Sequence, residues 1–239
     1  MAPPRHLAQI RTFRPRRRLN RRHVEALDRL WPRYGVVGPS AVPWQGDAAL
    51  NPVELNPVEL FGRRAPLVLE IGFGMGDATA DMAAADPARD YLAVEVHTPG
   101  IANLLGLIEQ RGLTNVRVVR GDALDLLRYG LPEASLDAIN VFFPDPWPKT
   151  RHHKRRLIQP DHVALMRSRL VPGGTLHCAT DWPDYADAML RTLTADPELV
   201  NQYDGFAPRT TRRPLTRYER RALAAGRPVF DLIFRRRSA

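Results

Sequence analysis

Short apolar runs alternate with amphipathic stretches from residue 66 onward. The apolar runs have the length of buried strands, and the stretches between them repeat their apolar positions at helical spacing. The apolar runs are 67–71, 91–96, 116–119, 138–143 and 175–179, and the amphipathic stretches lie near 77–85, 99–111, 123–129, 160–170 and 183–195. Strands that alternate with helices in this way form a mostly parallel twisted sheet with helices on both faces. The pattern therefore predicts an α/β fold whose ligands bind at the carboxyl ends of the strands.

The N-terminal part of the chain follows a different pattern. Residues 1–19 are rich in arginine and proline with little apolar periodicity, which predicts a flexible basic arm. Asn20 is placed to cap an amphipathic helix that runs to about Trp31 and is stopped by Pro32 and Gly35. We expect residues 20–239 to form a single domain.

Residues 35–65 are punctuated by proline and glycine, which predicts a loop region. This region contains a tandem pentapeptide repeat over 51–60, whose two copies are too few and too short for a solenoid. Beyond the alternating region, residues 214–225 predict a helix and residues 229–234 a closing strand. The core of the domain is therefore expected over about 66–239.

Positive charge gathers at the two ends of the chain and in one internal stretch. The net charge of +9 divides into +8 over 1–33, +8 over 209–239 and −7 over the body between them, which itself includes the basic stretch 144–156. Separate basic segments suit a polyanion such as a nucleic acid, held by the ends and the internal stretch. The alternative is that the basic ends are only solvated tails.

The internal basic stretch also contains both lysines of a chain that has 33 arginines. Lys149 and Lys154 present compact point charges, whereas an arginine presents a planar fork. Three prolines restrict the backbone around Asp145 and Trp147. A restricted turn that presents a carboxylate, an indole and cations has the character of a binding site. The alternative is a solvated loop in which two lysines fell together by chance.

The composition argues against several classes of protein. No run of about eighteen apolar residues occurs, and the arginine-rich N-terminus lacks the apolar stretch of a secretory signal, so we expect a soluble cytoplasmic protein without a membrane partner. The single cysteine, Cys178, is expected to be an inert core residue, which leaves no disulfide and no thiolate zinc site. No metal site is predicted, because the adjacent His152 and His153 are poorly placed to ligate one ion together.

The first apolar run ends in a glycine turn that leads into a helix. Glu70 precedes Gly72, Gly74 and Gly76, and Asp77 follows them. Glycines allow a tight turn and close approach of a ligand, and the helix N-terminus offers free N–H groups. The spacing differs from the dinucleotide fingerprint, and the Asp77 carboxylate would repel a pyrophosphate. The turn therefore favours a neutral or cationic ligand over a dinucleotide.

Carboxylates also end the next two apolar runs. Glu95 stands where a carboxylate accepts hydrogen bonds from ribose hydroxyls, and Asp122 follows the next run, although Asp122 alone is also a good helix N-cap. With Glu70 they suit a ligand that has a positive group, a ribose and an exocyclic amine, as S-adenosylmethionine does. The spacing over about 66–181 resembles that of class I SAM-dependent methyltransferases, which implies a Rossmann-like fold. The implied cofactor-binding residues are Glu70, Gly72, Gly74, Gly76, Glu95, Asp122 and Asp145.

A further motif carries a more specific resemblance. The stretch Phe-Pro-Asp-Pro-Trp-Pro-Lys over 143–149, followed by Arg-His-His-Lys-Arg-Arg over 151–156, resembles the signature of the bacterial tRNA (guanine-N7-)-methyltransferase family. Thr180-Asp181 with Tyr185, and the segment 216–219, match two further family segments. The resemblance covers roughly residues 20–239 and departs at Thr150, where the family pattern has another cation. It implies transfer of a methyl group from S-adenosyl-L-methionine to N7 of a guanosine in the variable loop of tRNA, at position forty-six.

The resemblance and the chemistry together suggest roles at the acceptor side. Guanine N7 carries a free lone pair, so positioning and stabilisation of the developing cation are needed rather than a base. Asp145 is the candidate catalytic residue and Asp181 the second choice. Trp147 either stacks on a base or packs the loop, and Lys149 reaches a phosphate or the guanine edge.

The remaining candidates are assigned by residue type. The acceptor-binding candidates are Lys149, Asp181, Thr216, Arg217, Tyr218 and Glu219, with a capping box of Thr216 and Glu219 as the alternative for the last four. The candidate RNA contacts are Arg151, His152, His153, Lys154, Arg155 and Arg156. A SAM enzyme acting on another RNA or a small molecule, and a nucleic-acid-binding protein without catalysis, stay open as alternatives. The sequence is compatible with a monomer or a homodimer.

Overall fold

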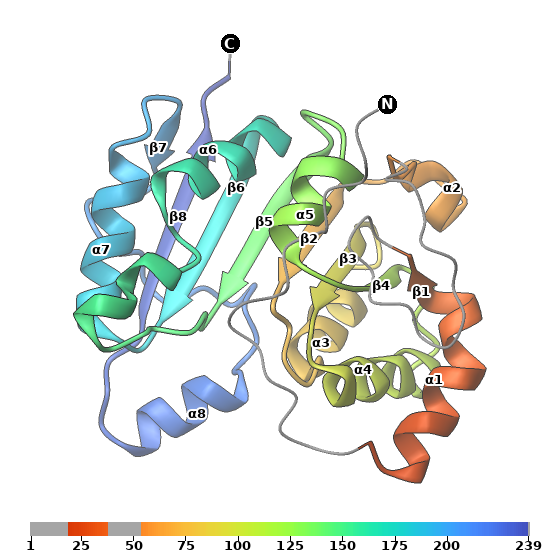
Figure 1. Ribbon diagram of the computed structural model, residues 1–239. Helices are drawn as coiled ribbons and strands as arrows, with labels where there is room; N and C mark the ends of the chain where they lie inside the picture. Colours follow the sequence, from red (N-terminus) through yellow and green to blue (C-terminus); the bar gives the residue numbers. More distant parts are fainter. Residues whose placement is uncertain (1–18, 38–53, 239) are drawn as a thin grey trace, which may run out of the picture.

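The computed structural model describes residues 19–37 and 54–238. Their strands form one eight-stranded sheet in the order β1-β4-β3-β2-β5-β6-β8-β7 (Figure 1). Neighbours from β1 to β6 pair in parallel, whereas β8 pairs antiparallel with both β6 and β7. The strands are β1 (Gly35–Val36), β2 (Leu67–Ile71), β3 (Asp90–Glu95), β4 (Val116–Arg120), β5 (Leu136–Phe142), β6 (Leu170–Thr180), β7 (Leu199–Asn201) and β8 (Phe230–Arg236). The predicted mostly parallel sheet is confirmed.

The helices follow the strands in the predicted alternation. They are α1 (Arg21–Tyr34), α2 (Pro57–Phe61), α3 (Asp77–Ala85), α4 (Thr98–Gln110), α5 (Ala123–Asp125), α6 (Pro160–Arg169), α7 (Pro183–Thr194) and α8 (Arg217–Ala224), with a π-helical turn η1 (Leu126–Gly130) and a 3-10 helix η2 (Thr150–Arg155). The strands β1 and β7 were not predicted, because two or three residues are too few to show the alternation of apolar and polar positions that marks a strand. Helix α2 lies inside the predicted loop region, where Asn56 caps it by accepting the Val58 N–H.

Of the two residues predicted to stop α1, Gly35 caps its end, whereas the stop at Pro32 is wrong. A proline removes one N–H and crowds the carbonyl four residues earlier. Pro32 stands in the last turn, however, and the turn still closes beyond it because the Gly35 N–H donates to the carbonyl of Trp31. Burial of Leu30 and Tyr34 holds this final turn against the body of the protein.

The start of α1 agrees with the prediction, because the Asn20 side chain accepts the His23 N–H. The predicted arm, apart from Leu19, and the beginning of the tandem repeat at 51–53 lie outside the described residues. Within the described ranges, no helix is long and apolar enough to span a membrane.

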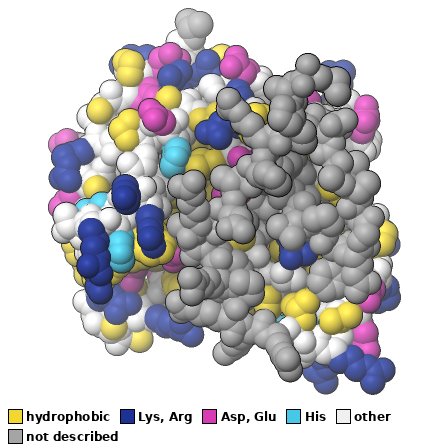
Figure 2. All heavy atoms as spheres, in the orientation of Figure 1, with side chains coloured by type: hydrophobic (Ala, Val, Ile, Leu, Met, Phe, Trp, Pro, Cys, Tyr) yellow, Lys and Arg dark blue, Asp and Glu magenta, His cyan; other side chains and the backbone are white. Residues whose placement is uncertain are grey.

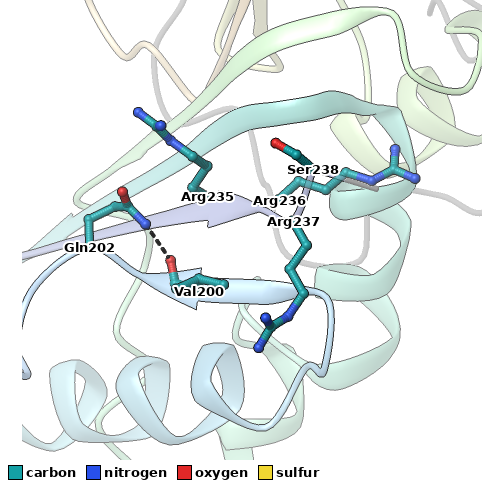
Figure 3. A pocket seen from close by; sticks show the side chains of 6 residues that line it. All are labelled: Val200, Gln202, Arg235, Arg236, Arg237 and Ser238. Carbon is teal, nitrogen blue, oxygen red and sulfur yellow. Dashed lines mark hydrogen bonds between the residues drawn. The ribbon is translucent and has the colours of Figure 1, made fainter.

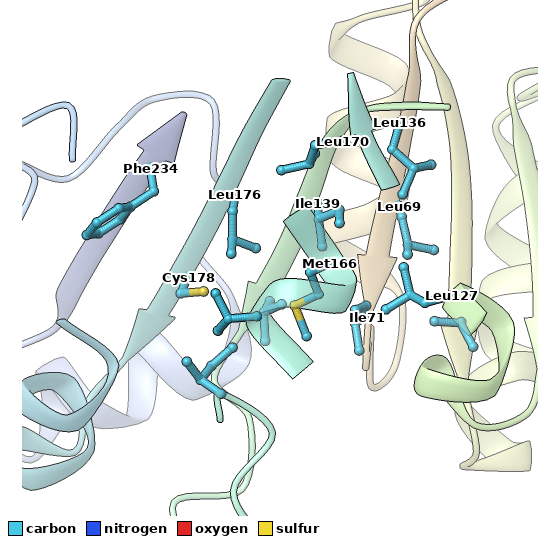
Figure 4. Packing of buried hydrophobic residues seen from close by; sticks show 14 of the residues in the cluster. Leu69, Ile71, Leu127, Leu136, Ile139, Met166, Leu170, Leu176, Cys178 and Phe234 are labelled. Carbon is cyan, nitrogen blue, oxygen red and sulfur yellow. The ribbon is translucent and has the colours of Figure 1, made fainter. Parts of the chain in front are cut away.

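Apolar side chains pack in one cluster on each face of the sheet. One cluster joins strand residues such as Leu69, Leu176 and Phe234 to Met166 of α6 (Figure 4). The other joins the opposite face to α1, α3 and α4. Cys178 belongs to the first cluster, and its complete burial raises the pKa of the thiol to about 12, so the thiol stays protonated. The prediction that it is a core residue is confirmed.

The strand order places the functional loops at one point of the sheet. From β2 the chain moves through β3 and β4 on one side, whereas β5 and β6 lie on the other. The carboxyl ends of β2 and β5 therefore flank the switch point at which ligands bind in sheets of this kind. The glycine turn follows β2, and the proline-rich loop 143–149 follows β5.

Helix α4 packs directly against the glycine turn. A Cβ on Gly100 would overlap the carbonyl oxygen of Gly74, and a Cβ on Gly76 would lie 2.6 Å from the Cβ of Leu104. Only glycine allows such close approach at these two positions. Gly76 of the turn and Gly100 of α4 are thus required by packing, whereas a Cβ on Gly72 or Gly74 would meet nothing within 4 Å.

Gly100→Ala is expected to lower the free energy of unfolding by about 1–3 kcal/mol, because the added methyl must displace backbone. Gly106→Ala in the same helix is the matched control, since a Cβ there meets nothing within 4 Å. Alanine at that position should stabilise the helix by about 0.5–1 kcal/mol. Urea denaturation of both variants measures the two effects, and equal effects would contradict the close contact.

Candidate active site

The glycine turn after β2 is held open by its own backbone geometry. Gly72, Gly74 and Gly76 have φ angles of 74°, 62° and 80°, in the left-handed region that favours glycine. The Gly76 N–H donates to the carbonyl of Phe73 at 3.0 Å. The turn therefore leads into α3 with backbone groups, rather than side chains, at the carboxyl end of β2.

Glu95 ties this turn to the end of β3. Its Oε2 accepts the Gly74 N–H at 2.8 Å, and its Oε1 accepts the N–H groups of Val96 at 2.7 Å and His97 at 3.0 Å. A carboxylate has about four acceptor positions, so this one is fixed in place and still has capacity for a hydroxyl donor. The structure thus brings together two predicted site elements, Glu95 and the glycine turn.

Glu70 is the buried carboxylate beside the turn. Glu70 is 3% exposed. Burial raises the pKa of its carboxyl from 4.5 to about 7, a hydrogen bond with Thr79 opposes this rise, and the charge of Glu95 adds to it. Burying the charged form of this carboxyl is costly unless a ligand compensates it. The site therefore fits a cationic ligand such as the sulfonium cofactor.

Asp122 lies at the end of the adjacent strand β4. It is the N-cap of α5, with its Oδ1 accepting the Leu124 N–H at 2.8 Å and the Asp125 N–H at 3.3 Å. The capping alternative is confirmed, and it leaves a cofactor role as a prediction. Glu70, Glu95 and Asp122 thus stand at the ends of the neighbouring strands β2, β3 and β4.

The loop after β5 is strained at two residues. Phe143 and Trp147 have φ angles of 54° and 46°, which side chains other than glycine rarely adopt. The Phe143 N–H donates to the carbonyl of Ala179 at 2.7 Å, and the Arg155 guanidinium lies 5.0 Å from the centroid of the Trp147 ring. Strain of this kind persists only where the surroundings impose it, and it often marks functional sites. Between the two strained residues, Asp145 is exposed to solvent.

Arg156 is the residue that holds this loop against α7. The sequence predicts an RNA contact, but the residue is only 4% exposed. Its Nε donates to the carbonyl of Pro146 at 2.9 Å, its Nη2 lies 2.5 Å from Asp184 Oδ2, and the guanidinium stacks 4.7 Å from the centroid of Tyr185. A guanidinium with these contacts is not available to an RNA backbone, so the predicted contact is corrected to an internal support.

The other cations of the predicted RNA-contact stretch point outward. Lys149, Arg151, Lys154 and Arg155 are exposed. His152 meets Trp147 edge to face, and desolvation together with the neighbouring cations lowers the pKa of its imidazole. Figure 2 shows basic and histidine side chains gathered on this side of the molecule, where η2 lies in Figure 1.

The segment that leads into α8 is fixed by a buried ion network. Arg213 is 0% exposed, and its guanidinium donates to Asp231 at 2.8 and 2.9 Å and to Glu219 at 2.5 Å. His177 Nε2 lies 2.7 Å from Asp231, and Arg209 donates to Glu219 at 2.7 Å. The sequence shows no sign of this network, because Arg213 is one of ten arginines in the last thirty-one residues.

The network changes the interpretation of Glu219, which the sequence predicts as an acceptor-binding residue. Burial alone would raise the pKa of its carboxyl, but the hydrogen bonds from Arg213 and Arg209 outweigh burial, and the pKa lies below its usual value. Its carboxylate is therefore an ionised internal partner. Half of the alternative capping box is confirmed, because the Thr216 hydroxyl accepts the Glu219 N–H at 3.1 Å.

The first residues of α8 lie beside both functional loops. The rings of Tyr218 and Phe143 stack with centroids 6.3 Å apart and planes at 18°, and the Tyr218 residue is 58% exposed. Arg217 Nε lies 3.8 Å from the carboxylate of Asp77 at the start of α3. Asp181, the second candidate for the catalytic role, accepts a hydrogen bond from Arg227 at 3.0 Å. Phe143 is the aromatic contact that the sequence did not single out.

Glu70→Gln is expected to raise the free energy of unfolding of the ligand-free protein at alkaline pH. Because the pKa in the folded protein lies above 4.5 at about 7, the contribution of the carboxyl is lost as the pH rises between these values. The advantage of the glutamine variant should therefore grow over this interval, to about 3 kcal/mol at pH 8. Thermal unfolding at pH 5 and pH 8 measures it, with Glu133→Gln as a control at a side chain that is 81% exposed. The same difference at both pH values would show that Glu70 is ionised throughout.

Solved structures share the fold at low sequence identity. The 16S rRNA methyltransferase KamB superposes with a TM-score of 0.57 at 18% identity, over 84% of this chain and 98% of that one. The [4+2]-cyclase SpnF superposes with a TM-score of 0.51 at 17% identity, over 91% of this chain and 93% of that one. The predicted Rossmann-like fold is confirmed, and the cyclase illustrates that this fold does not fix the reaction.

Relatives found by sequence share a higher identity with this chain than these solved structures do, and those described here carry the same name. A family model described as a putative methyltransferase matches residues 64–232. A tRNA (guanine-N(7)-)-methyltransferase of Streptomyces avermitilis is 53% identical over 231 residues, which cover 95% of this chain and 76% of that protein. A protein of the same name from Nitrosospira multiformis is 49% identical over 229 residues, which cover 95% of each chain. This agreement confirms the resemblance carried by the motif after β5, and the chain belongs to the tRNA (guanine-N(7)-)-methyltransferase family.

Proposed function

We propose that this protein transfers a methyl group from S-adenosyl-L-methionine to N7 of a guanosine in tRNA, in the variable loop at position forty-six. The observation that carries the proposal is the placement of the acidic glycine site at the end of β2 next to the exposed Asp145 after β5. The relatives named for this reaction match nearly the whole chain. Since the acceptor is tRNA, we place the enzyme in the cytoplasm.

The cofactor-binding role falls to the residues around the glycine turn. The buried carboxylate of Glu70 would balance the positive end of the cofactor, Glu95 would accept hydrogen bonds from the ribose, and Asp122 would accept one from the adenine amine. The glycines supply close backbone approach. When bound, the cofactor supplies a methyl group on a sulfonium, which leaves as a neutral thioether.

The acceptor side orients the guanine and stabilises its charge. The N7 lone pair forms the new bond to the methyl carbon as the carbon–sulfur bond breaks, so the positive charge passes to the purine. Asp145 accepts hydrogen bonds from the guanine N1–H and amino group and thereby stabilises this cation. Holding the reacting atoms near about 3 Å in line supplies roughly 7–11 kcal/mol of the barrier reduction.

Aromatic and basic side chains position the RNA around this centre. The exposed ring of Tyr218, backed by Phe143, offers a stacking surface for an unpaired base. Lys149 reaches the guanine edge or the adjacent phosphate, while Arg151, Lys154 and Arg155, with His152 and His153, contact the backbone. Arg217 and Thr216 hold the first turn of α8 beside the acceptor. Arg156 and Glu219 act as positioning residues instead of ligands.

The reaction is tested by digesting tRNA after incubation with the enzyme and labelled cofactor, followed by mass analysis of the nucleosides. Wild-type protein is expected to form 7-methylguanosine at one position of the variable loop. Asp145→Ala should lower kcat by about 10²-fold or more, with cofactor binding measured by calorimetry changed less than about tenfold, since its role is at the acceptor.

Three results would contradict this. A methyl group on another atom or on free guanosine would indicate a different SAM enzyme. Absence of cofactor binding would indicate a protein that only binds nucleic acid. An active Asp145→Ala enzyme would refute the role of that carboxylate.

Arg155 and Arg156 provide a matched pair for the loop. Arg155→Ala is expected to reduce the slope of log affinity for tRNA against log salt by about 0.7–0.9, because one phosphate contact is lost. Arg156→Ala should leave the slope unchanged and lower kcat by roughly 10- to 100-fold through a displaced loop. Filter binding at several salt concentrations, with single-turnover rates, measures both. A reduced slope for Arg156→Ala would show that Arg156 contacts the RNA backbone after all.

A further inference from the structure

The end of the sheet opposite the candidate site carries an arginine-lined cavity. Strand β8 pairs antiparallel with β6, so its first residue, Phe230, faces Thr180 near the site, whereas Arg235 faces Thr175. At about 3.4 Å per residue, Phe230 and Arg235 are roughly 17 Å apart. The cavity at the far end has a volume of about 250 Å³ and is lined by Arg89, Arg212 and Arg235.

The three arginines arrive from separate parts of the chain. Arg89 precedes β3, Arg212 belongs to the segment before α8, and Arg235 is the penultimate residue of β8. The backbone at Arg212 is fixed on both sides, because its N–H donates to the Thr210 hydroxyl at 3.1 Å and the next residue is the fully buried Arg213. The fold, rather than a flexible basic tail, therefore brings these side chains together.

The floor of the cavity is backbone. Gly173 has a φ of 79°, and a Cβ on Gly174 would lie 2.9 Å from the carbonyl oxygen of Val171. Gly173 and Gly174 therefore contribute backbone and no side chain to the lining. The volume is below the range of about 300–1,000 Å³ typical of sites for drug-sized ligands, so it suits a small group rather than a whole nucleotide.

Carboxylates compensate only part of the positive charge of the three arginines. Arg89 pairs with Asp86 at 3.2 Å, but within the described residues neither Arg212 nor Arg235 makes an ion pair or a side-chain hydrogen bond. One carboxylate, Asp137, also lines the cavity, and its Oδ2 accepts the Leu67 N–H at 2.8 Å. With Arg89 paired to Asp86, the three arginines still exceed the carboxylates around the cavity by one positive charge, which favours an anion with several acceptor oxygens.

Arg236 and Arg237, the two arginines that follow Arg235, differ from it because their side chains donate to backbone carbonyls. A neighbouring cavity of about 290 Å³ is lined by Arg235, Arg236 and Arg237, and Figure 3 shows Arg235 pointing away from the other two. Arg236 donates to the carbonyl of Leu170 at 2.5 Å, and Arg237 donates to the carbonyl of Pro197 at 2.9 Å. These two side chains hold the end of β8 in place. Within the described residues the Arg235 side chain makes no such hydrogen bond, so its guanidinium can bind a ligand.

We propose that the cavity lined by Arg89, Arg212 and Arg235 binds a backbone phosphate of the tRNA, away from the nucleotide that is methylated. The proposal rests on the proposed function, which supplies tRNA as the ligand. Arg217, Arg220 and Arg221 on α8 are exposed, as is Arg212 in the segment before that helix.

The experiment compares Arg212→Ala/Arg235→Ala with Arg64→Ala/Arg191→Ala, which removes the same charge at exposed arginines outside the cavity. The cavity variant is expected to bind tRNA about tenfold more weakly, with a salt slope reduced by about 0.7–0.9 and kcat at saturating tRNA unchanged. The matched control should change affinity less than about twofold. Arg212→Lys/Arg235→Lys should fall between the wild type and the alanine variant, because lysine keeps the charge and loses the fork. Thermal unfolding of each variant confirms that it folds.

A second measurement separates RNA phosphate from free phosphate. Unfolding temperatures are measured in sodium phosphate and in sodium chloride at equal ionic strength. If phosphate stabilises the wild type but not the alanine variant, and tRNA affinity equals that of the control, the ligand is a free phosphate and the RNA assignment is wrong. If neither phosphate nor tRNA distinguishes the variant from the control, the cavity is not a phosphate site. A wild-type protein that binds tRNA through the cavity without methylating it would instead refute the proposed function and leave the cavity assignment intact.

Discussion

The Arg213 guanidinium, fully buried between Glu219 and Asp231, is the constraint on which both ends of the molecule depend. Removing one partner of a buried ion pair leaves an uncompensated charge and costs about 3–5 kcal/mol. The segment before α8 can therefore lie only where both carboxylates meet the guanidinium. That position brings Tyr218 against Phe143 at the candidate site, and it fixes the backbone next to Arg212 at the far cavity.

Formal charge along this chain is a poor guide to the charge available for RNA. The last thirty-one residues contain ten arginines, yet Arg213 is neutralised internally and Arg209 shares the carboxylate of Glu219. In the loop after β5 the same division appears between the exposed Arg155 and the buried Arg156. Arginine serves both purposes because its planar fork can satisfy several buried acceptors at once and can equally grip a phosphate. An arginine that is buried holds internal acceptors, and one that is exposed can bind phosphate. The sequence alone does not show which arginines are buried.

The two halves of the candidate site are organised differently. Around the cofactor turn, Glu95 is held by three backbone N–H groups, and Glu70 is buried, which raises the pKa of its carboxyl to about 7. This half is built in advance at a cost in stability, which a cationic ligand offsets. On the acceptor side, Asp145 and Tyr218 are exposed. Asp145 lies between two residues with strained backbone, and Tyr218 lies in the first turn of the capped helix α8. Such an arrangement suits a small ligand that enters first and a large one that covers it.

The sequence by itself determined the alternation of strands and helices from residue 67 onward apart from β7, together with the glycine turn, the acidic strand ends and the family motif. These are local patterns: apolar period, turn chemistry and residue spacing depend on neighbours in the chain. It could not determine that α1 continues through Pro32, that Arg156 and Glu219 point inward, or that Phe143 meets Tyr218. Each of those depends on contacts between residues distant in sequence: the last turn of α1 on the packing of Tyr34, the carboxylate of Glu219 on Arg213, and the ring of Phe143 on the position of α8. Only the tertiary structure decides which of many similar arginines and carboxylates loses its water, because burial is a property of the packed chain.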